Sequence, residues 1–305
     1  MSRPTTIALL LLIAGCAPRI PAVKLDTAPH ARAGPTVSPC LLVGESVERR
    51  LYEGTATASL EEWHSGIGSI LIRHPKGMVI IDPAFGRTIE DDLKRSPPWF
   101  TAIMGTAHGK IPLLTLLERA GVDSREVAYA LLSHAHWDHA GALRDLPKAK
   151  VLLDEKEFAY ARGRRGHLDH GVMRHHFDIP AMRFQPFVLD GPPYEGFTAS
   201  KDLFGDGTIV AVPLHGHTPG HTGYFINGPD GARWLYIGDA AWALEGIKQP
   251  VHKNLLASGI VDHDLEAVAQ TLAVLHAFTE QRPDVKVVPA HDFDAMRTLP
   301  ECGAK

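Results

Sequence analysis

The sequence predicts an α/β fold, because short apolar runs typical of buried strands alternate with stretches of helical spacing along most of the chain. Histidine and aspartate side chains directly follow several of these runs, which places candidate functional groups on the loops that leave the strands. An apolar content of 45%, a charged content of 22% and a formal net charge of -4 are typical of an ordinary globular domain. This composition argues against a disordered chain and against nucleic acid as a partner.

Local patterns define the individual elements. Residues 69–73 and 78–81 are predicted to form a hairpin around a turn at residues 75–77. Helical spacing runs over residues 111–120 and stops at Gly121, a natural C-cap. The remaining predicted elements are strands at residues 127–132, 150–153, 209–212, 234–238 and 285–288, and helices after the candidate cap Asp154 and over residues 264–278.

The most informative segment runs from Ser133 to His139, with the sequence SHAHWDH, and brings four metal-capable side chains into six residues. In an extended segment alternate side chains point the same way, so His134 and His136 are expected to converge on one ion. Asp138 and His139 follow after the chain bends, and are expected to face a second ion. Imidazole and carboxylate ligands suit zinc and similar first-row metals.

Three further candidate ligands follow other predicted strands. His217 lies in the turn-rich segment PLHGHTPGH, Asp239 ends the segment WLYIGD, and His291 follows VKVVPA. Four strand ends therefore each present a metal-capable side chain.

These motifs together resemble those of the metallo-β-lactamase-fold hydrolases, over residues 65–292. The resemblance implies a four-layer αβ/βα sandwich with the metals at one edge. It also implies two zinc ions or similar divalent ions per chain. The ligands carried over from the family are His134, His136 and His217 for one ion, Asp138, His139 and His291 for the other, and Asp239 as a bridge between both.

A pair of divalent ions about 3.5 to 4 Å apart can share a water, lower its pKa and polarise a substrate carbonyl or phosphoryl oxygen. The expected nucleophile is therefore a metal-bridging hydroxide, and Asp239 holds both ions. Asp138 is expected to orient this hydroxide and to pass a proton to the leaving oxygen, which is general acid/base catalysis.

The bridging Asp239 and the lack of a cysteine near any ligand loop favour a substrate class close to that of N-acyl homoserine lactonases. Lactonases of that kind carry a tyrosine three residues after the bridging aspartate, whereas this chain has Trp242, the candidate substrate-binding residue. A lactone or related ester is therefore the expected small-molecule substrate. The alternatives are β-lactamase, thioesterase or phosphotriesterase activity at the same site, or a non-catalytic periplasmic lipoprotein that binds zinc.

Other polar residues receive supporting roles. His215 and His221 flank a ligand loop and are interpreted as hydrogen-bond partners of the ligands. Asp82, at the end of an early strand, is expected to support the metal loop from behind. The histidines at 167, 170, 175 and 176 are expected on an exposed loop, and the segment 167–204, with Phe177, Met182, Phe184, Phe187 and Tyr194, supplies either an apolar wall for an acyl chain or ordinary core.

The N-terminus predicts export. Residues 1–15 combine Arg3 with a short apolar run and resemble a bacterial lipoprotein signal, which makes Cys16 the expected site of lipidation. Ala17 lacks the charge associated with inner-membrane retention, so the expected location is the outer membrane facing the periplasm. Proline-rich residues 16–39 are predicted to form a tether, and residues 40–305 the catalytic domain.

Export also bears on the other two cysteines. An oxidising compartment permits Cys40 and Cys302 to pair, and the termini of a domain often lie close together. The sequence leaves open whether they form this bridge or remain free thiols, and it does not determine the oligomeric state.

Overall fold

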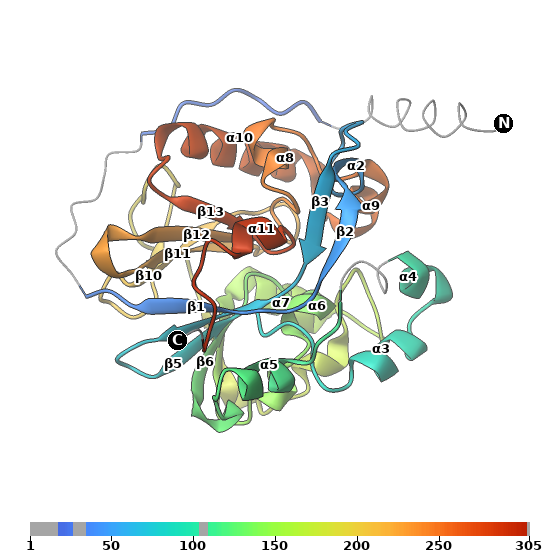
Figure 1. Cartoon of the computed structure of the whole chain (residues 1–305), viewed down its shortest axis with the longest axis vertical. Coiled ribbons are helices and arrows are strands. Elements are labelled where there is room, and N and C mark those ends of the chain that lie inside the picture. The colour runs from blue at the N-terminus through green and yellow to red at the C-terminus, as the bar shows by residue number, and fades with distance from the viewer. Residues whose placement is uncertain (1–17, 27–34, 104–108, 304–305) are drawn as a thin grey trace.

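The computed structural model describes residues 18–26, 35–103 and 109–303 and shows the predicted α/β architecture. The predicted signal peptide and Cys16 lie outside the described residues. Within them, two large sheets face each other and a two-stranded ribbon lies beside them (Figure 1).

The first sheet has the strand order β1-β4-β5-β6-β7-β8 in the described part of the chain. The second has the order β13-β12-β11-β10-β9, and the ribbon pairs β2 with β3. The pairings β5–β6, β6–β7, β7–β8 and β12–β13 are parallel, so several strands end at the same edge of the sandwich. The strands are β1 (Ser38–Leu42), β2 (Ser46–Arg50), β3 (Glu62–Gly66), β4 (Ser69–Arg73), β5 (Met78–Ile81), β6 (Val127–Leu131), β7 (Lys150–Asp154), β8 (Phe184–Phe187), β9 (Lys201–Asp202), β10 (Ile209–Pro213), β11 (Thr222–Asn227), β12 (Arg233–Gly238) and β13 (Lys286–Pro289).

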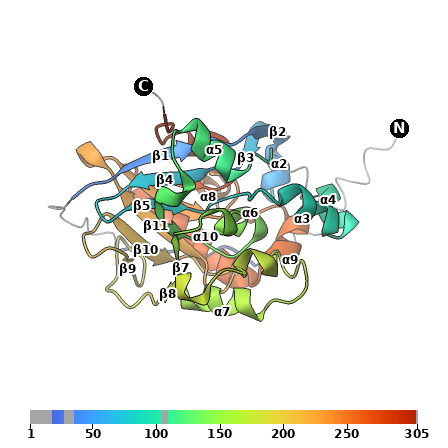
Figure 2. The same ribbon diagram turned by 90° about the horizontal axis from the view of Figure 1, so that it is seen from below.

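Helices cover the outer faces of both sheets, as two views of the ribbon show (Figures 1 and 2). The predicted cap Asp154 is present, since its carboxylate accepts the Lys156 N–H. Asp264, predicted as the first residue of its helix, is instead the N-cap and accepts the Glu266 N–H. Gly121 adopts a φ of 67°, as expected for a glycine that ends a helix. The α-helices are α2 (Leu51–Gly54), α3 (Ile89–Arg95), α4 (Pro98–Ile103), α5 (Leu113–Arg119), α6 (Trp137–Ala140), α7 (Glu155–Gly163), α8 (Glu245–Lys248), α9 (Leu255–Val261), α10 (Leu265–Gln281) and α11 (Phe293–Met296).

Three apolar cores separate four layers. Leu116 of α5 packs with Ile80 and Val151 on the outer face of the first sheet. The inner faces of the two sheets meet through side chains such as Ile81 of β5 and Tyr236 of β12. On the far side, α10 packs on β10, β11 and β12. Each of the two large sheets thus has one face toward helices and one toward the other sheet, which confirms the predicted four-layer αβ/βα sandwich.

The N-terminal part of the chain lies against this sandwich. The Pro18 carbonyl accepts a hydrogen bond from His252 Nε2 at 2.9 Å, and Ile20 packs against the core beneath α10. Strand β1 begins at Ser38, two residues before the expected start of the domain. The predicted tether is therefore partly held against the domain.

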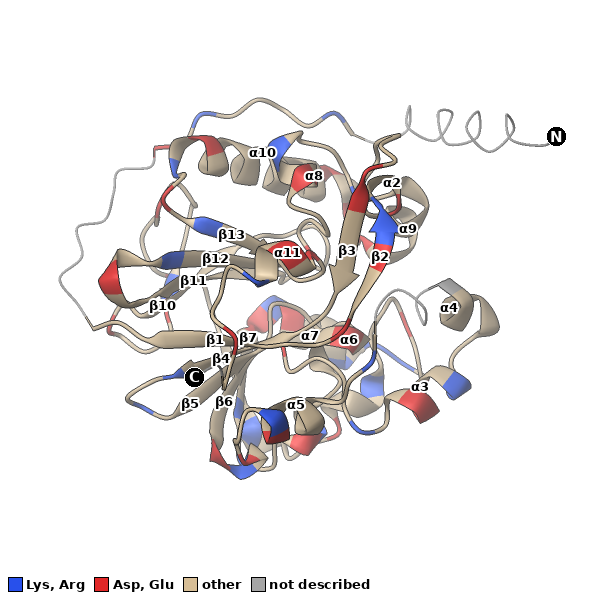
Figure 3. Ribbon diagram, viewed as in Figure 1, with Lys and Arg blue, Asp and Glu red and all other residues tan. Residues whose placement is uncertain are grey.

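Cys40 and Cys302 form a disulfide, with 4.9 Å between their Cα atoms, which decides the question left open by the sequence. The bridge joins β1 to the C-terminal residues across a sequence separation of 262. No helix among the described residues has the length and apolar content needed to cross a bilayer. Basic and acidic residues are interspersed over the helical layers (Figure 3), in keeping with the small net charge of the chain.

Candidate metal centre

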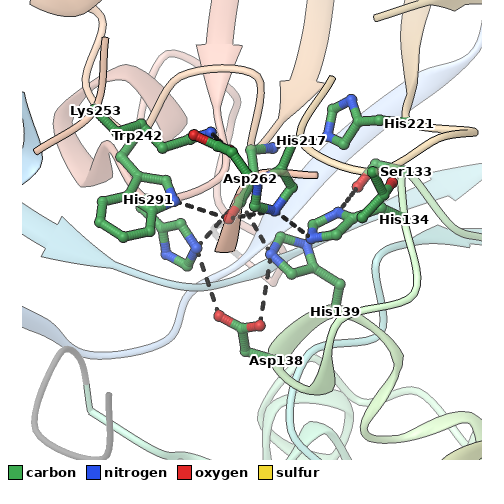
Figure 4. A network of polar contacts seen from close by, with 12 residues as sticks. Ser133, His134, Asp138, His139, His217, His221, Trp242, Lys253, Asp262 and His291 are labelled. Atoms are coloured by element: carbon green, nitrogen blue, oxygen red, sulfur yellow. Dashed lines mark hydrogen bonds and ion pairs between the residues drawn. The ribbon is translucent and has the colours of Figure 1, made fainter. Parts of the chain in front are cut away.

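The candidate ligands converge at the edge where the strands end. His134 and His136 lie on the loop after β6, and α6 then begins at Trp137 and carries Asp138 and His139. The other three follow strands of the second sheet, namely His217 after β10, Asp239 after β12 and His291 after β13. All seven side chains are buried, and the close-up shows the labelled ones facing one another (Figure 4).

The seven side chains divide into two triads that share one carboxylate. His134, His136 and His217 present nitrogen atoms within 4.8 Å of one another, and the Nε2 atoms of His134 and His217 are 3.2 Å apart. Asp138, His139 and His291 form the second group, in which Asp138 Oδ2 lies 3.5 Å from His291 Nε2. These are the two groups that the resemblance implied.

Asp239 lies between the triads. Its Oδ1 atom is 3.2 Å from Nε2 of both His139 and His291, whereas its Oδ2 atom is 3.5 Å from His217 Nε2. The preceding residue must be glycine, because Gly238 has a φ of 49° and an added Cβ would meet Ser133 Oγ at 2.6 Å. One carboxylate oxygen therefore faces each triad.

The donor set fits metal ions, because three of its inner atoms make no hydrogen bond while four of its outer ring nitrogens have protein partners. Nε2 of His136, Nε2 of His139 and Oδ1 of Asp239 are buried and make no hydrogen bond to any described residue. A ring of unpaired buried donors and acceptors is costly unless a ligand pairs with it.

The opposite ring nitrogens are held by the protein. His139 Nδ1 contacts Asp82 at 2.7 Å and His217 Nδ1 contacts Asp262 at 2.7 Å. His134 Nδ1 contacts Ser133 Oγ at 3.0 Å, and His291 Nδ1 contacts the Gly66 carbonyl at 3.2 Å. Such outer hydrogen bonds orient the imidazoles of metal sites with Nε2 toward the ion.

The electrostatics of the site also favour cations. Burial lowers the pKa of His134 and His136 well below the ordinary value, so both imidazoles are in the neutral form that binds metals. Burial acts in the same direction on His139, but the nearby carboxylates of Asp239, Asp138 and Asp82 outweigh it and raise the pKa of His139 well above its usual range. A field that holds a proton this strongly also attracts a divalent ion.

Asp82 supports the metal loop, as the sequence indicated. Its carboxylate accepts the Ser133 N–H at 2.7 Å and the Ser133 hydroxyl at 2.5 Å, in addition to its contact with His139. The Tyr236 hydroxyl of β12 donates to it at 2.8 Å. The Asp82 carboxylate therefore connects the first sheet, the second sheet and one candidate ligand.

Glu157 of α7 was not predicted as part of the site. Its carboxylate is buried and accepts the backbone N–H groups of Ala135 at 2.8 Å and Gly220 at 3.0 Å, and the Thr218 hydroxyl at 2.6 Å. Burial raises the pKa of Glu157 to about 7, against the effect of these hydrogen bonds. Glu157 therefore links the loop after β6 to the loop after β10. The sequence showed only that Glu157 belongs to a predicted helix, so it gave no sign of this role.

Asp262 and Lys253 were also missed. Both side chains are buried, the ammonium group of Lys253 lies 2.5 Å from Asp262 Oδ1, and the Ser258 hydroxyl donates to the same carboxylate. Lys253 precedes α9 and Asp262 follows it. Because Asp262 also contacts His217, this pair attaches both ends of α9 to a candidate ligand. No motif marks these residues, since their partners are distant in sequence.

The two flanking histidines differ. His221 Nε2 accepts the backbone N–H of Asp239 at 3.1 Å, so its predicted supporting role agrees with the geometry. The backbone carbonyl of His215 instead accepts the Thr271 hydroxyl at 2.7 Å. The structure gives the ring of His215 no contact with a candidate ligand.

A second histidine cluster surrounds Asp92 of α3. The carboxylate lies 2.7 Å from His175 Nε2 and 3.1 Å from His176 Nε2, and the Asp92 backbone carbonyl lies 2.7 Å from His167 Nε2. His176 is buried and His170 is exposed, so the expectation of an exposed loop is correct for His170 and wrong for His176.

This cluster is better explained by hydrogen bonding than by metal binding. The Nδ1 atoms of His167 and His176 are buried without a partner among the described residues, unlike the outer nitrogens of the candidate ligands. The cluster fixes the segment that contains Gly171, where an added Cβ would meet the His136 ring at 2.6 Å. It therefore shapes the wall beside a candidate ligand.

The centre lies in a pocket of about 750 Å³ that also contains Trp242 and Trp99. The indole N–H of Trp242 donates to Asp239 Oδ2 at 2.8 Å, so in this arrangement it holds the shared carboxylate and does not point at a substrate. The aromatic residues of segment 167–204 pack elsewhere. Phe177, Phe184, Phe187 and Tyr194 contact the cores, and the side chain of Met182 is 88% exposed.

The sequence profile of the metallo-β-lactamase superfamily matches residues 67–291, well over half of the chain. The chain belongs to this superfamily. This superfamily member is 31% identical over 231 residues to the N-acyl homoserine lactonase AttM of Azorhizobium caulinodans, a match that covers 74% of this chain and 81% of the relative. It is 28% identical to AttM of Agrobacterium fabrum with the same coverage. The superfamily match and the lactonase relatives together identify this protein as a metal-dependent hydrolase.

Solved structures show the same fold. An AiiA variant of B. thuringiensis with N-decanoyl-L-homoserine bound at its active site superimposes with a TM-score of 0.64 at 15% identity, over 87% of this chain and 98% of that one. The dizinc quorum-quenching lactonase AidC superimposes with a TM-score of 0.54 at 16% identity, over 90% of each chain.

We expect Glu157→Ala to lower the free energy of unfolding by roughly 3 kcal/mol or more, because three buried donors lose their acceptor at about 1–3 kcal/mol each. Urea denaturation followed by circular dichroism measures the change. Glu155→Ala, at an exposed position on the same helix, is the control and should have little effect. Equal losses in the two variants would contradict the linking role of Glu157.

Proposed function

We propose that this protein is a dinuclear zinc-dependent hydrolase that opens N-acyl homoserine lactones or closely related esters. The observation that carries the proposal is the position of Asp239, whose two carboxylate oxygens face different ligand triads. A storage site for a single ion has no use for a carboxylate shared in this way.

The pocket supports a substrate that has a small polar head and an apolar tail. The buried groups of the metal centre, among them Asp138, Asp239 and His291, line one part of it, and Phe100, Leu168 and other apolar side chains line it as well. A volume of about 750 Å³ lies in the range of pockets that enclose a small molecule. A lactone ring at the floor would leave its acyl chain against the walls.

The residues of the chain then have distinct tasks. When bound, two divalent ions would supply an activated water and polarise the substrate carbonyl. His134, His136 and His217 would hold one ion, and Asp138, His139 and His291 the other. Asp138, whose Oδ1 atom is 3.9 Å from His139 Nε2, would lie beside the substrate and pass a proton to the leaving oxygen of the opened ring.

Similarity to relatives supports the choice of substrate. The two AttM proteins carry the name N-acyl homoserine lactonase and match this chain over 74% of its length. The pocket differs at Trp242, where the lactonases discussed above have a tyrosine. Because its N–H is engaged by Asp239, we assign Trp242 the task of orienting the shared carboxylate.

We expect the purified protein to contain about two zinc or similar ions per chain, as measured by inductively coupled plasma mass spectrometry. His134→Ala and His217→Ala should each empty one site, whereas Asp239→Ala should reduce occupancy of both, since its oxygens face both triads. His170→Ala, at an exposed position, is the control and should leave the metal content unchanged. Catalysis by wild-type protein free of transition metal would refute the dinuclear assignment.

Substrate class is tested with a panel of acyl homoserine lactones, aryl esters, thioesters, β-lactams and phosphotriesters. We expect the highest kcat/KM for lactones, and its loss on removal of metal by a chelator and recovery on addition of zinc. A preference for β-lactams, thioesters or phosphotriesters would move the assignment to the corresponding alternative. Stoichiometric zinc without hydrolysis of any compound would favour a zinc-binding lipoprotein.

We also propose that the protein is exported and anchored through a lipid on Cys16, at the outer membrane facing the periplasm. The signal-like residues 1–15 support this, and so does the disulfide between Cys40 and Cys302, because such bridges persist mainly in oxidising compartments. The lipid on Cys16 would then insert directly into the bilayer.

Cys16→Ser tests the anchor. Because the thioether to the lipid requires sulfur, we expect the variant to lose incorporation of labelled fatty acid and to leave the membrane fraction. Cys302→Ser is the control, since it removes a cysteine of the domain and should still be labelled. Equal labelling of wild type and Cys16→Ser would remove the lipidation proposal.

A further inference from the structure

The mouth of the pocket carries an unusual share of the exposed apolar surface. Among the described residues, six large apolar side chains are classed as exposed, and three of them line this pocket. These three, Trp99, Leu256 and Ile260, have exposed fractions of 50%, 57% and 42%. Single exposed apolar residues are common, but a group around one opening marks an interaction surface.

Two short helices form this rim. Leu256 and Ile260 are four residues apart on α9 and therefore lie on the same face of the helix. Trp99 belongs to α4, and its ring packs edge-to-face on Phe100, with ring centroids 5.8 Å apart. Both helices border the same pocket, so the exposed side chains of this rim lie at its opening.

The N-terminal segment lies next to the rim. Pro18 is hydrogen-bonded through its carbonyl to His252, which is buried and precedes α9 by only three residues. Cys16 is two residues before Pro18, and two residues of extended chain span at most about 7 Å. A lipid on Cys16 would therefore enter a bilayer close to the apolar rim.

We propose that the rim formed by Trp99, Leu256 and Ile260 docks on a phospholipid surface, so that the pocket opens toward the membrane. The orientation of the domain on the membrane rests on the proposed lipid anchor. The side chains that insert into the bilayer are the three exposed ones of the rim. Tryptophan and aliphatic residues are well suited to the boundary between headgroups and acyl chains. Lactones or esters with long acyl chains, which partition into bilayers, would then reach the pocket from the lipid.

The charges at the pocket indicate that docking is apolar. Arg49, the basic residue that lines the pocket, pairs with Glu53 at 3.1 Å, so the two charges offset each other. Binding by a basic patch requires anionic lipid and weakens with salt, whereas insertion of apolar side chains requires neither condition. We therefore expect docking on vesicles of phosphatidylcholine alone.

Quenching of tryptophan emission by brominated lipid measures this directly. The lipidated protein is reconstituted into vesicles of phosphatidylcholine with or without bromine on the acyl chains. The emission of Trp99 is obtained as the difference between wild type and Trp99→Phe, because the other four tryptophans, Trp63, Trp137, Trp234 and Trp242, are present in both proteins. We expect bromine to quench about half or more of this difference, since interfacial side chains insert to depths of about 5–10 Å.

Paired variants identify the surface. Leu256→Ser with Ile260→Ser should reduce the quenching of Trp99, whereas Met182→Ser with Val188→Ser, two exposed apolar residues that do not line the pocket, should not. Unquenched Trp99 in lipidated protein, or docking that requires anionic lipid and is lost in high salt, would overturn the proposal.

The assay involves no turnover, so it is independent of the proposed lactone activity. If labelled fatty acid shows that Cys16 carries no lipid, the same vesicles added to the unlipidated chain test the rim alone. Quenching there would retain the docking surface without the anchor, and its absence would refute the surface.

Discussion

The buried carboxylate of Asp82 is the group on which the rest of the centre depends. It accepts hydrogen bonds from the backbone and hydroxyl of Ser133, from His139 and from Tyr236, which belong to both sheets and to the metal loop. A buried anion is tolerated only with such partners, and each partner is oriented in return. The relative position of the two sheets and the orientation of one ligand are therefore set by the same group.

The other ligands follow the same principle on a smaller scale. Glu157 holds the backbone of two ligand loops, and Asp262 holds His217. Asp262 faces the outer ring nitrogen of its ligand, whereas Nε2 of His136, Nε2 of His139 and Oδ1 of Asp239 are buried and make no hydrogen bond within the described part of the chain. A site with fixed outer contacts and free inner atoms loses little entropy when an ion binds, and it keeps its geometry during reaction.

The position of the centre at one edge of the sandwich also determines how a substrate approaches. α4 and α9 stand beside the strand ends, so Trp99, Leu256 and Ile260 border the opening of the pocket. The network of Lys253, Ser258 and Asp262 attaches α9 to His217, and the N-terminal segment meets the chain just before the same helix. One short helix thus connects the proposed membrane contact, the opening of the pocket and a candidate metal ligand.

Much of the centre was determined by the sequence itself, because its signals are local. The spacing of His134, His136, Asp138 and His139 after an apolar run, and the single candidates after three other runs, placed the candidate ligands at strand ends. The family resemblance that these motifs carry then implied the layers and both triads. Caps such as Asp154 were equally visible, since a cap bonds to backbone two or three residues away. What only the tertiary structure decided are contacts between distant segments. Glu157 bonds to loops 22 and 61 residues away, Asp92 contacts histidines more than 80 residues later, and Trp242 turns its N–H toward Asp239. Such pairings depend on how the sheets and helices pack, which no local pattern records.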